Sequence, residues 1–178
     1  MSGTAFVYGT LMAPEVLKLL IKRVPESRAA TLKGYARYRV KGQVFPAIIP
    51  STSESKVKGM VLMELSRSEL HILDVYESEE YYRATVEPEL EDGSTSPADV
   101  YVWKDEHKHL LDGEWIYEEW RQLHLHRWVQ RCQLLLQQPD WDYSEFMQQH
   151  LPAYLDMTQG FMQECFPQQR QQQQQQQQ

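Results

Sequence analysis

Apolar and polar residues alternate with a period of two along five stretches in the first part of the chain. This period is typical of strands that bury one face. It predicts strands at residues 4–8, 32–40, 57–65, 81–88 and 98–104. Turn-forming residues lie between these strands, at 41–43, 51–55 and 91–97.

A helical period interrupts the strands in two places. Pro14 suits the first turn of a helix, and one face of the segment after it is apolar. That face consists of Val16, Leu17, Leu20 and Ile21. A second helix is predicted to begin at Ser66, because Ser66 and Glu69 have the spacing of a capping box, and to run toward Tyr76. Short strands with single helices and no regular alternation predict an α+β domain built on a small mixed β-barrel with flanking helices.

The pattern changes at about residue 114, where a long helical segment begins. Its apolar residues are spaced 3, 4 and 3 apart, at Leu125, Trp128, Cys132 and Leu135. Pro139 is predicted to end this helix, and two further helical stretches are predicted at about 143–149 and 153–165.

The chain therefore divides into three predicted parts. Residues 1–128 form the barrel domain, and residues 129–167 form a C-terminal helical extension packed on it. Residues 168–178 are glutamine interrupted only by Arg170, and such a low-complexity tail is predicted to be disordered.

Composition narrows the classes of function. The 178 residues carry a formal charge of −7, which argues against nucleic acid and anionic membrane as partners because both require a basic surface. No apolar run approaches the roughly 20 residues that cross a bilayer, and the first ten residues do not resemble a signal peptide. Cys132 and Cys165 are the only cysteines, so a reduced, cytoplasmic setting is expected.

The turn after the first predicted strand is one candidate site. Gly9 lets the backbone bend, and Thr10 adds a hydroxyl near several amides. Successive N–H groups that point inward would form a small nest for a carboxylate or an oxyanion. The motif by itself also fits an ordinary strand-to-helix connection.

An acidic segment after the second predicted helix is the other candidate. Asp74 and Glu77 are three residues apart, so they occupy neighbouring positions on one helix face. Glu77 lies where the helix should end, and Glu79 and Glu80 are expected to be solvated loop charges. For Glu77 too, an ordinary structural role remains open at this point.

Other patterns add no chemistry. His107 with His109 and His124 with His126 form two His-x-His pairs, but helix positions two apart diverge, so we expect no metal site. The phosphate-binding, dinucleotide-binding and nucleophile-elbow motifs do not occur.

Several short motifs together resemble the γ-glutamylcyclotransferase superfamily, and within it the plant avirulence-induced-gene-like branch. They are "FVYGTL" at 6–11, "FPAIIP" at 45–50 and "LDVYESEEYYR" at 73–83, followed by "YVW", "GEW", "EEW" and "MTQGFMQE". The resemblance covers about residues 4–128 and 157–164. Relative to that branch, residues 129–155 look like an insertion, and Ser78 stands where a glycine often follows the family's glutamate.

The resemblance implies a site at one mouth of a small barrel. It implies Glu77 as the catalytic base and no metal or other cofactor. Substrate-binding positions carried over from the motifs are Tyr8, Gly9, Thr10, Leu11, Met12, Ala13, Tyr81 and Arg83.

The implied reaction is intramolecular acyl transfer on a small γ-glutamyl compound, which releases 5-oxoproline and an amine or amino acid. Two alternatives stay open at this point. One is a γ-glutamylamine cyclotransferase that acts on γ-glutamyl-lysine, and the other is a catalytically silent ligand-binding or interaction module with the same fold. The sequence leaves the oligomeric state open.

Overall fold

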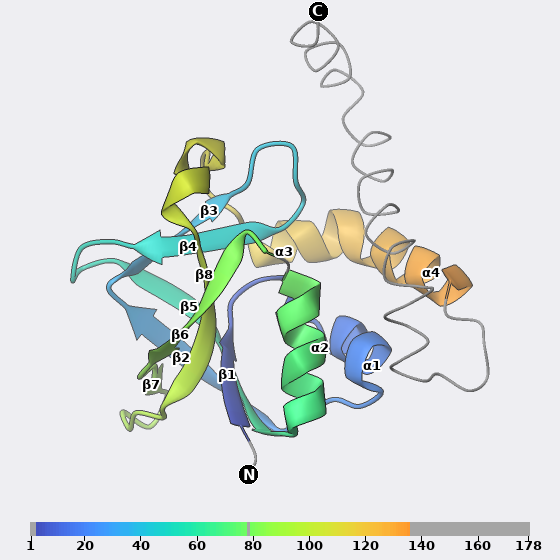
Figure 1. Cartoon of the computed structure of the whole chain (residues 1–178), viewed down its shortest axis with the longest axis horizontal. Helices are drawn as coiled ribbons and strands as arrows, with labels where there is room; N and C mark the ends of the chain where they lie inside the picture. Colours follow the sequence, from blue (N-terminus) through green and yellow to red (C-terminus); the bar gives the residue numbers. More distant parts are fainter. Residues whose placement is uncertain (1–2, 78, 136–178) are drawn as a thin grey trace, which may run out of the picture. The chain divides into compact units, whose positions relative to one another are not determined.

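The computed structural model describes residues 3–77 and 79–135 (Figure 1). The chain divides into two compact units, one of Met1–Lys41 with Phe45–Glu118 and the other of Gly42–Val44 with Glu119–Gln178. The first unit contains the sheets and both helices predicted before residue 114. The predicted extension at 129–167 and the tail at 168–178 lie mostly outside the described residues and stay predictions.

A six-stranded mixed sheet is the framework of the first unit. Its order is β6 (Tyr81–Val86), β8 (Ala98–Trp103), β1 (Gly3–Val7), β5 (Lys56–Leu65), β2 (Ser27–Lys33) and β7 (Glu89–Leu90). Only β1 and β8 run parallel among its neighbouring strands; the other pairs are antiparallel.

The sheet is open, since its order begins at β6 and ends at β7 without a ladder between these two edges in the described part of the chain. The prediction of an α+β fold with a mixed sheet is confirmed, whereas the predicted closure into a barrel is not. Only the two residues 87–88 separate β6 from β7 in sequence, so a two-residue loop joins the two edge strands.

The strand β1 lies in the middle of this sheet, between β8 and β5. Ala5, Phe6 and Val7 are buried, and Val7 pairs with Met60 of β5. Gly59 next to it has no side chain because a Cβ there would collide with the carbonyl oxygen of Val7. The end of β1 is therefore held on both sides, and the turn after it starts from a fixed point.

A separate two-stranded sheet is formed by β3 (Tyr35–Arg39) and β4 (Pro46–Pro50). The prediction of one strand at 32–40 is wrong, because the chain turns at Gly34 with φ +80. A positive φ is a conformation that glycine adopts at little cost. The other four predicted strands are confirmed within two residues, and the sequence pattern missed β4, β7 and the part of β2 before Leu32.

Both predicted helices of the first unit are confirmed. The helix α1 (Pro14–Ile21) starts at its proline and buries the four apolar residues of its predicted face. The helix α2 (Arg67–Glu77) has a capping box: the Glu69 backbone N–H donates to Ser66 Oγ at 3.2 Å, and the Ser66 N–H donates to Glu69 Oε2 at 2.7 Å. The helix α2 ends at Glu77, so this acid occupies the helix terminus where the sequence placed it.

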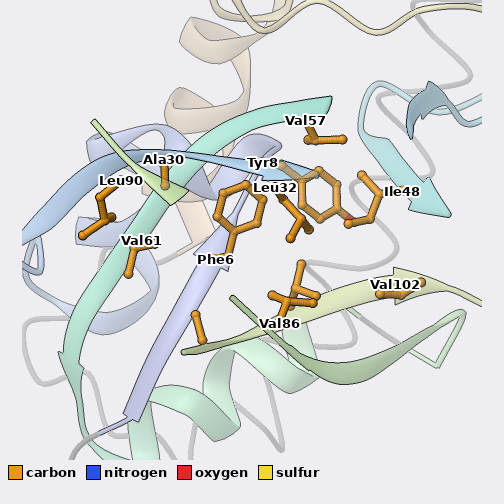
Figure 2. Packing of buried hydrophobic residues seen from close by; sticks show 12 residues of the cluster. Phe6, Tyr8, Ala30, Leu32, Ile48, Val57, Val61, Val86, Leu90 and Val102 are labelled. Carbon is orange, nitrogen blue, oxygen red and sulfur yellow. The ribbon is translucent and has the colours of Figure 1, made fainter. Parts of the chain in front are cut away.

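The core of the first unit brings the sheet and the small β3–β4 sheet together. Figure 2 shows Tyr8 next to Ile48 of β4, among apolar side chains of β1, β2 and β5. The phenol of Tyr8 therefore reaches through the core from the end of β1, and the residues around it exclude water.

Helical structure after residue 116 follows the predicted long segment in part. It consists of α3 (Tyr117–Trp120), a π-helical stretch at Arg121–Leu125 and α4 (His126–Leu135). The predicted end at Pro139 and the helices at 143–149 and 153–165 lie outside the described residues. Among the described helices, none has the length and apolar character needed to span a bilayer.

Candidate functional site

The turn after β1 is tight, and its glycine is required by a close approach. A Cβ on Gly9 would lie 2.8 Å from Pro46 Cγ, so any larger residue would push against β4. The single 3₁₀ turn Thr10–Met12 comes next, in which Met12 N–H donates to the Gly9 carbonyl at 3.0 Å. The N–H groups of Thr10 and Leu11 begin this turn, where helical geometry supplies no acceptor for them.

Tyr8, which leads into the turn, is hydrogen-bonded through both its hydroxyl and its backbone carbonyl. Its hydroxyl donates to the Tyr101 carbonyl at 2.7 Å, and its own carbonyl accepts from Arg37 Nη1 at 2.7 Å. Burial, and after it the charge of Glu77, raises the pKa of Tyr8 well above its usual value. Tyr8 is therefore a neutral hydrogen-bond donor at any ordinary pH.

A hydrogen bond joins the turn to the last turn of α2. Thr10 Oγ1 lies 2.7 Å from the Tyr76 hydroxyl, and Glu77 is the next residue. The two segments that the sequence singled out, at Gly9–Thr10 and Asp74–Glu77, are thus in contact despite 66 residues of separation between the bonded pair.

The Glu77 carboxyl group lies in surroundings that disfavour its charge. Burial raises the pKa of Glu77 to about 8, although part of the residue remains accessible to solvent. This position suits a group that must exchange a proton with a bound molecule, because the carboxyl is shielded while the residue still reaches the surface.

Three buried tyrosines respond to the charge of Glu77. Burial is the largest cause of the raised pKa of Tyr8, Tyr81 and Tyr101, and the charge of Glu77 contributes to all three. For Tyr81 the charge of Tyr8 counts for more than that of Glu77, and for Tyr101 the hydrogen bond and charge of Asp74 do. Tyr81 lies on β6, Tyr101 on β8, and Tyr8 directly follows β1.

Tyr81 is held by the same proline that covers Gly9. Its hydroxyl donates to the Pro46 carbonyl at 2.8 Å, and its ring packs edge-on against Trp103 with centroids 4.8 Å apart. The hydroxyl hydrogen of Tyr81 is therefore committed to the Pro46 carbonyl, and substrate binding by Tyr81 stays a prediction.

Arg83 lies farther out than the sequence suggested. Its guanidinium is 3.3 Å from Asp74 and 3.6 Å from Asp99, and its side chain is 40% exposed. Asp74 also accepts from the Tyr101 hydroxyl at 2.8 Å. Asp74 therefore links Arg83 to Tyr101, and substrate binding by Arg83 stays a prediction.

The other predicted substrate-binding positions in the turn are Leu11, Met12 and Ala13. Leu11 and Ala13 are buried in the core, and Met12 is half-buried. Any contact of Leu11 or Ala13 with a ligand would come from the peptide groups of the turn.

Two residues that contact the turn were not singled out by the sequence, Arg37 and Tyr76. Arg37 lies inside a segment with the period of a strand, where a central arginine between two tyrosines was the available signal. Tyr76 stands beside Glu77 in the quoted motif, but sequence spacing gives no reason to pair it with Thr10.

The histidine pairs and the acids Glu79 and Glu80 form no cluster of metal ligands in the described part of the chain. Residues 3–77 and 79–135 contain no group of three His, Cys, Asp or Glu side chains arranged to hold a metal ion. His107 and His109 lie in a separate 3₁₀ segment, Asp105–Leu110, and Glu79 and Glu80 are exposed.

Sequence comparisons find relatives that match about two thirds of the chain. Residues 5–122 match the family described as "Gamma-glutamyl cyclotransferase, AIG2-like". The chain is 44% identical over 132 residues to AIG2-like protein D of Arabidopsis thaliana, covering 70% of this chain and 86% of that protein. It is 47% identical over 118 residues to AIG2-like protein C of the same plant, covering 66% and 68% of the two chains.

Structural comparisons give the same fold. Two solution structures of Arabidopsis thaliana proteins align with TM-scores of 0.58 and 0.60 at 34% and 35% identity; they cover 79% and 76% of this chain, and 95% and 82% of their own. A structure described as a gamma-glutamyl cyclotransferase aligns with a TM-score of 0.54 at 17% identity, over 75% of this chain and 87% of that one. At that identity the likeness concerns the fold alone.

Proposed function

Since this chain belongs to the AIG2-like branch of the gamma-glutamyl cyclotransferase family, we propose that it cyclises a small γ-glutamyl compound with Glu77 as the base. The observation that carries the proposal is the shielded carboxyl of Glu77, next in sequence to the Tyr76 that bonds Thr10 of the turn after β1. The products are 5-oxoproline and a free amine or amino acid.

The chemistry is an exchange of one amide bond for another. The α-amine of the γ-glutamyl group attacks its own γ-carbonyl carbon and forms the C–N bond of the ring. The C–N bond to the leaving nitrogen then breaks. One proton leaves the attacking amine and one arrives on the departing amine, so a single group that accepts and returns a proton completes the reaction.

Glu77 has the properties that this proton transfer requires. A base works best when its pKa lies near the working pH, and burial brings the pKa of Glu77 to about 8. An unperturbed glutamate, with a pKa of about 4.3, would be too weak a base for an amine whose own pKa is about 8. Burial thus brings the pKa of Glu77 close to the pKa of the substrate amine.

The turn offers donors for the charge that develops on the carbonyl oxygen. The N–H groups of Thr10 and Leu11 start the 3₁₀ turn next to the Thr10–Tyr76 contact. One such donor aimed at an oxyanion is typically worth about 10² to 10³ in rate. Because nucleophile and carbonyl are parts of one molecule, holding that molecule folded supplies much of the remaining acceleration.

The test is release of 5-oxoproline from γ-glutamyl amino acids, glutathione and γ-glutamyl-lysine. We expect turnover by the wild-type protein and loss of about 10² or more in Glu77→Gln, the size of a general-base contribution. The matched control is Glu79→Gln, because Glu79 is an exposed acid two residues away. Equal turnover by wild type and Glu77→Gln would refute the role of Glu77.

A further inference from the structure

Arg37 is a cation fixed at the turn by the backbone of Tyr8. It lies on β3, opposite Ile48 of β4, and Nη1 donates to the Tyr8 carbonyl at 2.7 Å. The guanidinium also lies over the ring of Trp115, 5.2 Å from its centroid. A carbonyl on one side and an aromatic face on another hold the group in one orientation.

In the described part of the chain, the Arg37 guanidinium makes one hydrogen bond, to the Tyr8 carbonyl. A guanidinium carries five N–H donors in a planar fork, and the bond to Tyr8 uses one nitrogen. Among the described residues Arg37 makes no ion pair. The carboxylates whose charges reach it, on Glu114 and Glu118, belong to exposed residues. A half-buried guanidinium with unused donors is suited to a carboxylate brought by a ligand.

Arg37 and Glu77 act on Tyr8 with opposite signs. The charge of Glu77 raises the pKa of Tyr8 and that of Arg37 lowers it. Arg37 bonds the turn at the Tyr8 carbonyl, whereas α2, which carries Glu77, bonds it at Thr10. The cation and the helix that carries the base therefore contact the turn at different residues.

We propose that Arg37 determines substrate specificity by binding the carboxylate of the departing amino acid, so that the site prefers γ-glutamyl amino acids to γ-glutamyl amines. The inference rests on the proposed function, in which Glu77 takes the amine of the glutamyl end. Because Arg37 is held at Tyr8 and α2 at Thr10, we assign the cation to the opposite end of the substrate, beyond the scissile amide.

Two substrates that differ by one carboxylate test this directly. γ-Glutamyl-alanine and γ-glutamyl-ethylamide have the same leaving skeleton except for that group. For the wild type we expect kcat/KM to be about 10- to 100-fold higher for γ-glutamyl-alanine, the size of a charge-assisted hydrogen bond. Arg37→Gln should bring the ratio close to one by lowering only the value for γ-glutamyl-alanine.

Two further variants separate specificity from structure. Arg37→Lys keeps the charge without the fork and should retain part of the preference, and it serves as the test should Arg37→Gln not fold. Arg39→Gln is the matched control, because Arg39 lies two residues along the same strand and is exposed. Its ratio should equal that of the wild type.

The outcomes distinguish this inference from the function on which it rests. Equal kcat/KM values of the wild type for both substrates would overturn the role of Arg37 and leave the cyclotransferase proposal standing. An equal fall on both substrates in Arg37→Gln would also overturn it, since the arginine would then act on the glutamyl end or on the fold. No 5-oxoproline from either substrate with the wild type would refute the proposed function itself.

Discussion

The hydroxyl of Thr10 and the hydroxyl of Tyr76 lie 2.7 Å apart and join the turn after β1 to the end of α2. Through this bond the position of the turn depends on the position of the helix that carries Glu77. A base and an oxyanion donor are effective only when both are held at fixed places. The Thr10–Tyr76 bond is a contact that links the turn to the helix that carries Glu77.

Breaking this link should lower activity more than stability. In Thr10→Val and Tyr76→Phe the hydrogen bond is lost, which costs about 1 kcal/mol of folding free energy. We expect a fall in kcat of about tenfold or more, because the turn and Glu77 are no longer held together. Chemical denaturation and 5-oxoproline release, measured on the same preparations, check this. The double variant should lose little beyond either single one; additive losses would show that the two residues act separately.

The carboxyl of Glu77 should make the protein less stable as pH rises. Its pKa is about 8 in the folded protein and about 4.3 in an unfolded chain, so the folded state retains the proton over this range. The contribution of this carboxyl to the free energy of unfolding is fully present below about pH 4 and is lost as the pH rises to about 8. Glu77→Gln lacks the titration and should be more stable than the wild type at pH 8, by several kcal/mol at most.

Denaturation curves at pH 5 and pH 8 measure this difference. Glu79→Gln, at an exposed position, should show the same pH dependence as the wild type. A stability difference between Glu77→Gln and wild type that stays constant from pH 5 to pH 8 would contradict the raised pKa.

The contact between Gly9 and Pro46 should be sensitive to a single methyl group. A Cβ at residue 9 lies 2.8 Å from Pro46 Cγ and 3.0 Å from Pro46 Cδ, so Gly9→Ala forces β4 or the turn to shift. Such overpacking typically costs about 1–3 kcal/mol. Pro46→Ala removes both ring atoms, so the double variant should recover part of the loss. A double variant less stable than Gly9→Ala by the full cost of Pro46→Ala would show that the two residues do not compete for space.

Arg83 should matter little for turnover. Its guanidinium is paired with Asp74 and Asp99 on an exposed face, and exposed ion pairs contribute about 0–1 kcal/mol. We expect Arg83→Gln to keep KM within about threefold of the wild type, a small effect on this energy scale. A large rise in KM without loss of stability would support substrate binding by Arg83, as the sequence motif suggested.

The sequence predicted local structure where one physical signal dominated. The capping box at Ser66 and Glu69 and the apolar face after Pro14 depend on residues within one helix, and both helices form as predicted. The strand at 32–40 was wrong because Gly34 interrupts an unbroken period of two with a positive φ. Sheet closure was also beyond the pattern, since it depends on pairing between β6 and β7 and not on either strand alone.

The motifs singled out two segments of the candidate site, the turn after β1 and Glu77, but not the contact between them. Glu77 and the turn stood out by residue type and position, whereas their contact runs through Tyr76 and Thr10, 66 residues apart. Arg37 was missed because a strand pattern treats its polar residues as solvent-facing, while this one turns back to the Tyr8 carbonyl. The pKa of Glu77 likewise depends on burial that only the packed structure reveals.

The pH dependence of kcat/KM for 5-oxoproline release tests the role of Glu77 as the base most directly. This quantity reports ionisation of the free enzyme and the free substrate, so the titration of the substrate amine is measured separately and divided out. With Glu77 as the base, activity should rise with pH along a limb that has a pKa of about 8, and Glu77→Gln should lack that limb. A limb near pH 4.5, or an unchanged limb in Glu77→Gln, would contradict this role.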